Sequence, residues 1–182
     1  MNDHELARRF EAAMSPHLDA AYNLARWLAR DPHDAEDVVQ EAYLRAFRFF
    51  GGFRGGDGRA WLLQIVRNTF YSWLEQRRQR KADVEYDEAT IGLHIEDASG
   101  DEALYGTDPE KLLLRAADQN LVERGLQQLA PEYREILVLR ELEELSYKEI
   151  AGIVGVPLGT VMSRLSRARA QLRARIVAIE QA

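Results

Sequence analysis

The chain has 182 residues, a formal net charge of −6 and 46% hydrophobic residues, which together allow one globular domain or two small ones. It contains no cysteine, so the sequence excludes disulfides, thiolate-bound zinc and thiol redox chemistry. The acidic start Met1–Glu5 lacks the apolar core of an export signal, and no apolar run approaches the length of a membrane helix. We therefore expect a cytoplasmic chain without membrane insertion.

Apolar residues recur at three- and four-residue spacing through residues 4–29, which predicts one or two amphipathic helices. Asp31-Pro32 ends this pattern, and Asp34 is the predicted N-cap of the next helix, over residues 35–49. A stripe on the polar side of that helix is either a solvated surface or a contact face, and the residues alone leave both open. The stripe includes Asp37, Gln40, Glu41 and Arg45.

Five glycines fall within residues 51–59, which predicts a loop rather than a packed element. This loop is either a flexible connector or, through Phe53 and its flanking arginines, a contact for nucleic acid. Residues 60–81 then predict a helix, with Trp61 and Trp73 expected in the core. Aromatic residues interleaved with arginine suit single-stranded DNA, because bases stack on rings and phosphates pair with guanidinium groups. The polar and aromatic residues left for such a role are Arg67, Asn68, Tyr71, Arg77, Arg78, Arg80 and Lys81.

Residues 82–110 hold ten acidic residues and no lysine or arginine, and they lack a sustained apolar pattern. This composition predicts a flexible acidic linker. Pro109 and Pro131 follow helix-start signals, and apolar residues at helical spacing follow each of them. The sequence therefore predicts an all-α chain, with small helical domains over 1–81 and 111–182.

The last part of the chain, residues 145–175, predicts a helix-turn-helix. Ser146 and Glu149 have the spacing of a capping box, Gly155 can take the left-handed conformation of a sharp turn, and Pro157 bars continuation of the first helix. The second helix carries five arginines and no acid from residue 160 to residue 175. Short polar and guanidinium side chains suit base edges and phosphates in the major groove, although a solvated basic face is the simpler alternative. The candidates are Thr160, Ser163, Arg164, Ser166, Arg167 and Arg169.

No catalytic constellation is visible. The four histidines are scattered, none has a metal-ligand spacing with a carboxylate, and no phosphate-binding Gly-Lys-Ser/Thr loop occurs. We therefore expect neither an enzyme nor a bound metal or cofactor.

Three motifs in this order and spacing resemble those of bacterial RNA polymerase sigma factors of the extracytoplasmic-function (ECF) type. Residues 34–47 are similar to the region-two helix of that family, which docks on the clamp coiled coil of the polymerase. Residues 53–55 and 61–68 are similar to the segment that opens the −10 promoter element and captures a flipped base. Residues 129–134, through the helix-turn-helix, are similar to region four, which reads the −35 element.

The resemblance implies three partners: core RNA polymerase, promoter DNA and an anti-sigma factor. It implies polymerase contacts at Asp37, Gln40, Glu41 and Arg45. It implies −10 contacts at Phe53, Arg54, Arg67, Asn68, Tyr71 and Arg77. It implies −35 contacts at Thr160, Ser163, Arg164, Ser166, Arg167 and Arg169. Met162 and Ser166 depart from relatives that carry long basic or aromatic side chains there, so fewer direct base contacts are expected.

Two other classes of protein are alternatives. A helix-turn-helix regulator that binds DNA without polymerase needs only the C-terminal part, and it leaves residues 34–47 and the glycine-rich loop unexplained. A pure interaction module that binds no DNA leaves the arginines of residues 164–175 without a role.

Overall fold

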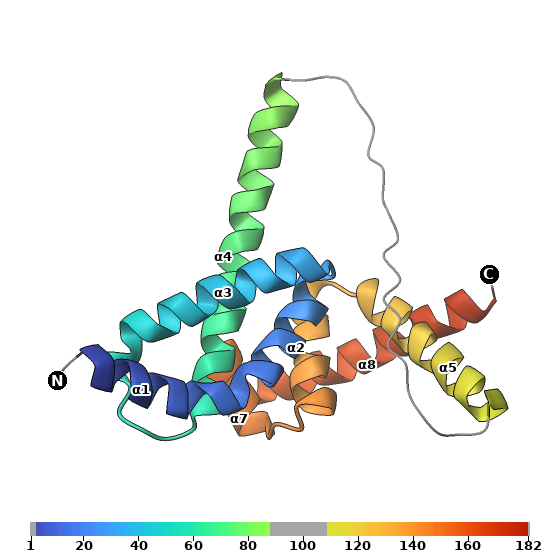
Figure 1. The fold of residues 1–182 in the computed structure, drawn as a ribbon. Helices are drawn as coiled ribbons and strands as arrows, with labels where there is room; N and C mark the ends of the chain where they lie inside the picture. Colours follow the sequence, from blue (N-terminus) through green and yellow to red (C-terminus); the bar gives the residue numbers. More distant parts are fainter. Residues whose placement is uncertain (1–2, 88–108, 182) are drawn as a thin grey trace.

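The computed structural model describes residues 3–87 and 109–181, and all regular structure in these two ranges is helical (Figure 1). The all-α prediction is therefore confirmed. The N-terminal half contains α1 (Asp3–Met14), η1 (Ser15–His17), α2 (Leu18–Ala29), α3 (Pro32–Phe49), η2 (Phe50–Gly52) and α4 (Gly58–Asp87). The C-terminal half contains α5 (Pro109–Gln127), α6 (Pro131–Leu137), the π-helical turn η3 (Val138–Leu142), α7 (Tyr147–Val154) and α8 (Leu158–Glu180).

The N-terminal half is built on mutual packing of α2, α3 and α4, with α1 against α4. The amphipathic pattern of residues 4–29 forms α1, η1 and α2, as predicted. On α3, Val38, Ala42 and Ala46 turn inward and are at most 1% exposed, so the opposite side of the helix is left to solvent. The ring of Phe10 from α1 closes this core by edge-to-face contact with Tyr43.

The predicted start of α3 was wrong. The N-cap is Asp31, whose carboxylate accepts hydrogen bonds from the backbone N–H groups of His33 (2.8 Å) and Asp34 (3.0 Å). Pro32 is the first helical residue, where its missing N–H costs nothing and its fixed φ suits the helix. The proline that ends the preceding pattern therefore begins the next helix.

Helices extend into both ends of the range predicted as the acidic linker. Helix α4 continues through Asp87, and α5 begins at Pro109, so both ends of the range 82–110 are helical. The segment after Lys81 begins Ala82-Asp83-Val84-Glu85 and contains no glycine or proline before residue 88, so nothing in it stops the helix. The rest of the predicted linker lies outside the described residues.

The C-terminal half is organised by α8, against which α5, α6 and α7 pack. The helix-turn-helix prediction is confirmed in detail. Ser146 accepts from Glu149 N and the Glu149 carboxylate accepts from Ser146 N, which is the capping box. Gly155 has φ 74°, the left-handed turn. The two halves also contact each other, because α4 packs against α7 and α2 packs against α6.

Candidate nucleic-acid interface

The outer side of α3 carries the residues predicted to contact polymerase, Asp37, Gln40, Glu41 and Arg45. Asp37 and Gln40 are exposed, whereas Glu41 and Arg45 are partly buried and form an ion pair of 2.7 Å. An i,i+4 pair of this kind contributes only about 0.3–0.5 kcal/mol, so a binding partner could break it at little cost. Leu44 and Phe49 on the same helix are 55% and 66% exposed. A helix with both charged and apolar exposed side chains suits a protein partner better than plain solvent.

Phe53 lies in the turn between α3 and α4, with its ring centroid 4.9 Å from that of Trp61. Gly55 and Gly56 have φ values of 85° and 101°, which side chains rarely adopt, so this path of the loop requires glycine. Phe53, Arg54 and Trp61 line a hollow of about 440 Å³. The aromatic rings and the guanidinium group at its wall suit stacking of a flat base, although the carboxylates of Asp57 and Glu149 also line it.

Arg67, Asn68 and Tyr71 come together on α4. The guanidinium carbon of Arg67 lies 4.6 Å from the centre of the Tyr71 ring, and Nη1 of Arg67 donates to Oδ1 of Asn68 at 3.4 Å. Arg77 is further along the helix and pairs with Asp34 of α3 at 2.6 Å. The structure therefore joins three of the predicted −10 residues and places Arg77 in a separate contact.

The recognition helix α8 is oriented by burial of Val161, Leu165 and Ala168, each at most 1% exposed. The other side of the helix therefore faces outward, with Ser163 and Arg167 exposed. Of the remaining predicted residues on this helix, Ser166 and Arg169 are exposed, and Thr160 and Arg164 are partly buried.

Unlike the other predicted −35 residues, Arg169 forms an ion pair within the described part of the chain. Its Nη2 lies 2.6 Å from Oε1 of Glu141, within the C-terminal half. Hydrogen bonding to this carboxylate raises the pKa of Arg169. Arg169 is therefore held against its own domain, whereas Arg167 has no carboxylate partner among the described residues.

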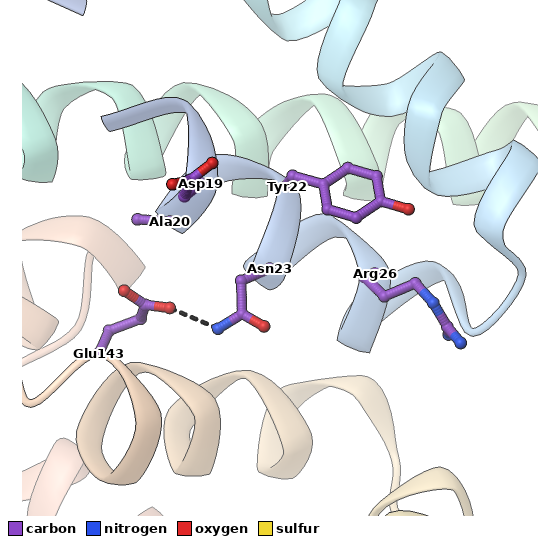
Figure 2. A pocket seen from close by; sticks show the side chains of 6 residues that line it. All are labelled: Asp19, Ala20, Tyr22, Asn23, Arg26 and Glu143. Atoms are coloured by element: carbon purple, nitrogen blue, oxygen red, sulfur yellow. Dashed lines mark hydrogen bonds between the residues drawn. The ribbon is translucent and has the colours of Figure 1, made fainter. Parts of the chain in front are cut away.

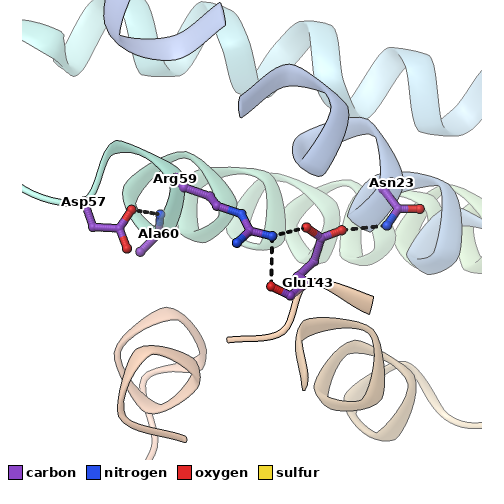
Figure 3. A network of polar contacts seen from close by, with 5 residues as sticks. All are labelled: Asn23, Asp57, Arg59, Ala60 and Glu143. Atoms are coloured by element: carbon purple, nitrogen blue, oxygen red, sulfur yellow. Dashed lines mark hydrogen bonds and ion pairs between the residues drawn. The ribbon is translucent and has the colours of Figure 1, made fainter. Parts of the chain in front are cut away.

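Two glutamates of the C-terminal half bind the N-terminal half, and neither was predicted as a site residue. Glu135 accepts from Arg67 twice, at 2.9 Å from Nε and at 3.2 Å from Nη2. Glu143 pairs with Arg59 and accepts from the side-chain amide of Asn23 at 2.6 Å (Figure 3). The Arg59 guanidinium also donates to the backbone carbonyl of Glu143 at 2.9 Å. These contacts tie α4 and α2 to the segment α6–η3.

The contact between Asn23 and Glu143 borders a hollow of about 430 Å³ (Figure 2). Asn23 points across it from α2 toward Glu143, and Tyr22 and Arg26 lie on the α2 side. Glu143 is only 6% exposed, because packing of the two halves against each other buries its carboxylate.

Burial changes the titration of the groups between the halves. Loss of water raises the pKa of Glu135, and the Arg67 guanidinium opposes that rise. Burial also raises the pKa of Tyr71, and the neighbouring Glu135 carboxylate raises it further. The Coulombic effect of Arg164 on Glu135 shows that this arginine of α8 also lies near the junction. The charges of Arg67, predicted for the −10 element, and of Arg164, predicted for the −35 element, therefore both act on the Glu135 carboxylate.

Sequence reasoning missed Glu135 and Glu143 because each pairs with a residue far away in the chain. The available signal was local: Arg134 and Glu135 stand beside the apolar run Ile136-Leu137 in a short helix, and all four are buried. A charged residue in an otherwise buried helix needs a partner, but the sequence does not say which.

Across the described residues, no helix combines the length and apolar character that crossing a membrane requires.

Comparison with known proteins accounts for both halves. Residues 13–80 match the sigma-70 region 2 family, and residues 119–172 match the sigma-70 region 4 family. The RNA polymerase sigma-H factor of Pseudomonas aeruginosa is 36% identical over 167 residues, which is 89% of this chain and 83% of that protein. The ECF RNA polymerase sigma-E factor of Escherichia coli K12 is 40% identical over 139 residues, 75% of this chain and 70% of that protein.

A solved structure also has this fold. The sigma factor RpoE of Bartonella quintana, crystallised with the anti-sigma factor NepR, aligns with a TM-score of 0.75 at 29% identity, over 93% of this chain and 97% of that one. The two helical halves thus have the architecture of a two-region sigma-70 protein. The chain belongs to the ECF family of RNA polymerase sigma factors.

Proposed function

We propose that this chain binds core RNA polymerase and directs it to promoters by contacting the −10 and −35 elements. The observation that carries the proposal is the order of the two matched regions, each of which presents an exposed face with the chemistry its role needs. Residues 1–81 would hold polymerase and open the −10 element, residues 111–182 would read the −35 element, and 82–110 would join them. A regulator that acts without polymerase would have no use for the exposed face of α3.

The polymerase contact is assigned to the stripe on α3. Gln40 is exposed and Glu41 is partly exposed, so both can change without disturbing the core. Gln40→Ala combined with Glu41→Lys should weaken binding to core polymerase and leave helix content unchanged. Glu5→Lys, an exposed charge reversal on α1, is the matched control. A folded double variant that bound core polymerase as tightly as the Glu5 control would contradict this assignment.

The −10 contact is assigned to Phe53 and Arg54 in the loop and to Arg67, Asn68 and Tyr71 on α4. Extruding a base costs a few kcal/mol, which ring stacking and hydrogen bonds of this size can offset. Phe53→Ala and Asn68→Ala should therefore reduce promoter opening more than binding to closed duplex. Permanganate reactivity of thymines near the start site measures the opening. Normal opening by both variants would leave the loop as a connector.

The −35 contact is assigned to the outward side of α8. Arg167 is exposed and has no carboxylate partner among the described residues, and Arg164 is partly buried beside the junction. Loss of a base contact flattens the preference between promoter sequences, whereas loss of a phosphate contact weakens all sequences equally. Arg164→Ala or Arg167→Ala should flatten the preference between −35 sequences. Arg173→Ala should weaken binding to all sequences equally and reduce the salt dependence of binding. Binding to a panel of mutated −35 elements at two salt concentrations distinguishes them.

The partner that restrains this chain is proposed to be an anti-sigma factor. The support comes from the sigma factor RpoE of Bartonella quintana, which was crystallised with an anti-sigma factor. Its alignment covers 93% of this chain and 97% of that one. Co-purification of the chain with the product of a neighbouring gene would identify it.

A further inference from the structure

The first turns of α8 carry an apolar side chain that faces outward. Burial of Val161 and Leu165 fixes the rotation of the helix, and Met162 is left 53% exposed. From Ser163 to Arg169, the exposed side chains of α8 are all serine or arginine. Residues near the N-terminus of a recognition helix are the ones that contact base edges in the major groove. Met162 therefore has the position of a base contact and an apolar chemistry that its exposed neighbours lack.

Met162 also lines a hollow of about 360 Å³ between α7 and α8. Tyr147, at the start of α7, lines the same hollow, and so does the buried side chain of Leu165. The Tyr147 ring is held by Arg140, whose guanidinium carbon lies 4.9 Å from the ring centre. The hollow therefore has an apolar lining that is fixed in place by the helix-turn-helix itself.

The polar lining of this hollow includes Ser166 and Arg173. Ser166 comes one helical turn after Met162, so the two side chains are neighbours on one side of α8. The Ser163 hydroxyl donates to the carbonyl of Thr160 at 3.1 Å. The Ser166 hydroxyl, by contrast, makes no hydrogen bond within the part of the chain that the structure describes, so its O–H is available to a base.

Thymine is the base whose edge fits both groups. In the major groove it presents its C5 methyl group and the O4 acceptor, whereas the other three bases carry no methyl group there. A methionine side chain is unbranched and polarisable, so it adapts to a small apolar group. A serine hydroxyl beside it can donate to O4. Arginine pairs with guanine edges or phosphates, so the arginines of α8 supply no preference for thymine.

We propose that Met162 and Ser166 together read one thymine of the −35 element. Met162 contacts the C5 methyl group, and the Ser166 hydroxyl donates to O4. This inference rests on the proposed −35 role of α8, and it adds the base that the helix selects at one position and the two side chains that select it.

Selection from a randomised DNA pool supplies the probe. The chain, assembled with core RNA polymerase, is incubated with duplexes randomised at the −35 and −10 positions, and the retained DNA is sequenced. The most enriched duplex is then synthesised with each −35 thymine of either strand replaced in turn by deoxyuridine. This replacement removes the C5 methyl group and keeps O4 and base pairing. We expect one such replacement to weaken binding of the wild-type chain about fourfold, the loss for one buried methyl group.

Variants of α8 assign that loss to a side chain. Met162→Ala should bind the thymine and uracil duplexes equally, whereas Met162→Leu, which stays apolar, should retain most of the preference for thymine. Ser166→Ala should weaken binding to both duplexes by a similar factor, because both contain O4. Val177→Ala is the matched control, since it shortens another exposed apolar side chain of the same helix and should keep the fourfold preference.

Two results would overturn the thymine contact. The first is a wild-type chain whose binding is weakened by none of the uracil replacements. The second is a folded Met162→Ala variant that keeps the full preference for the methyl group. Failure of the proposed function gives a different pattern, in which no −35 sequence is enriched from the pool, and the thymine contact then falls with it.

Discussion

Arg134 provides the sharpest test of how the two halves are held together. It is 1% exposed, and its guanidinium donates to three backbone carbonyls rather than to a carboxylate. Nη1 reaches Trp27 O at 2.9 Å and Leu28 O at 3.2 Å, and Nη2 reaches Leu129 O at 3.0 Å. Because α2 ends at Ala29, the first two carbonyls are among the last of that helix and lack helical partners. A cation from α6 thus caps the negative end of α2.

The expected effect of Arg134→Met follows from two opposing contributions. Hydrogen bonds from a charged donor contribute about 1.5–3 kcal/mol each, so three contribute roughly 5–9 kcal/mol. Burial lowers the pKa of Arg134 to about 10, a penalty on the charged form of about 3 kcal/mol. Replacing the side chain by methionine removes both, and the free energy of unfolding should fall by roughly 2–6 kcal/mol.

Urea unfolding followed by circular dichroism measures this loss. Arg134→Lys keeps the charge but cannot present two nitrogens in one plane, so it should fall between the wild-type chain and Arg134→Met. Arg175→Met, an exposed arginine on α8, is the control for loss of charge. If Arg134→Met were as stable as Arg175→Met, the carbonyl contacts would contribute no net stability and the capping argument would be wrong.

Three further predictions concern single positions. Because burial raises the pKa of Glu135, its contribution to the free energy of unfolding should be full below about 4.5 and decline as pH rises through the raised pKa. Urea unfolding of the wild-type chain and Glu135→Gln across pH should show this decline in their difference. Ser146→Ala should cost about 1 kcal/mol, since it removes the capping bond to Glu149 N. Gly155→Ala should cost about 1–2 kcal/mol because φ is 74°, whereas Gly152→Ala, in a helix with open space around it, should gain up to about 1 kcal/mol. Thermal melting of both glycine variants would refute the turn argument if they shifted in the same direction.

The helices and the helix-turn-helix were predictable because they depend on near neighbours in the chain. The capping box at Ser146 and the left-handed Gly155 lie within ten residues of each other, and the structure contains both. The start of α3 was misplaced because two aspartates precede it, and the preference of proline for the first helical position decides in favour of Asp31. Of the predicted site residues on α4, Arg67 and Tyr71 share a face because they are four residues apart, whereas Arg77 lies further along and pairs with Asp34.

The junction between the halves could not be predicted, because its contacts join residues that are far apart in the chain. Arg67 and Glu135 are 68 residues apart, and Asn23 and Glu143 are 120 apart, so no local pattern connects them. The charges do not indicate the pairing either. An arginine that binds a carboxylate cannot be distinguished by its sequence neighbours from an arginine that binds a phosphate. Only the packing of α4 against α7 and of α2 against α6 decides between them.

Two of the charged contacts at the junction, those of Arg134 and of Glu135, differ in what stabilises them. Arg134 binds three backbone carbonyls, and two of them lie at the end of α2, where they have no helical partner. Glu135 is a charge that burial disfavours, as the raised pKa shows, so the Coulombic attraction of Arg67 must first offset the loss of water. Separation of the halves would return Glu135 to water and so recover most of that loss. The Arg134 contact therefore contributes more to holding the two halves together than the Arg67–Glu135 pair does.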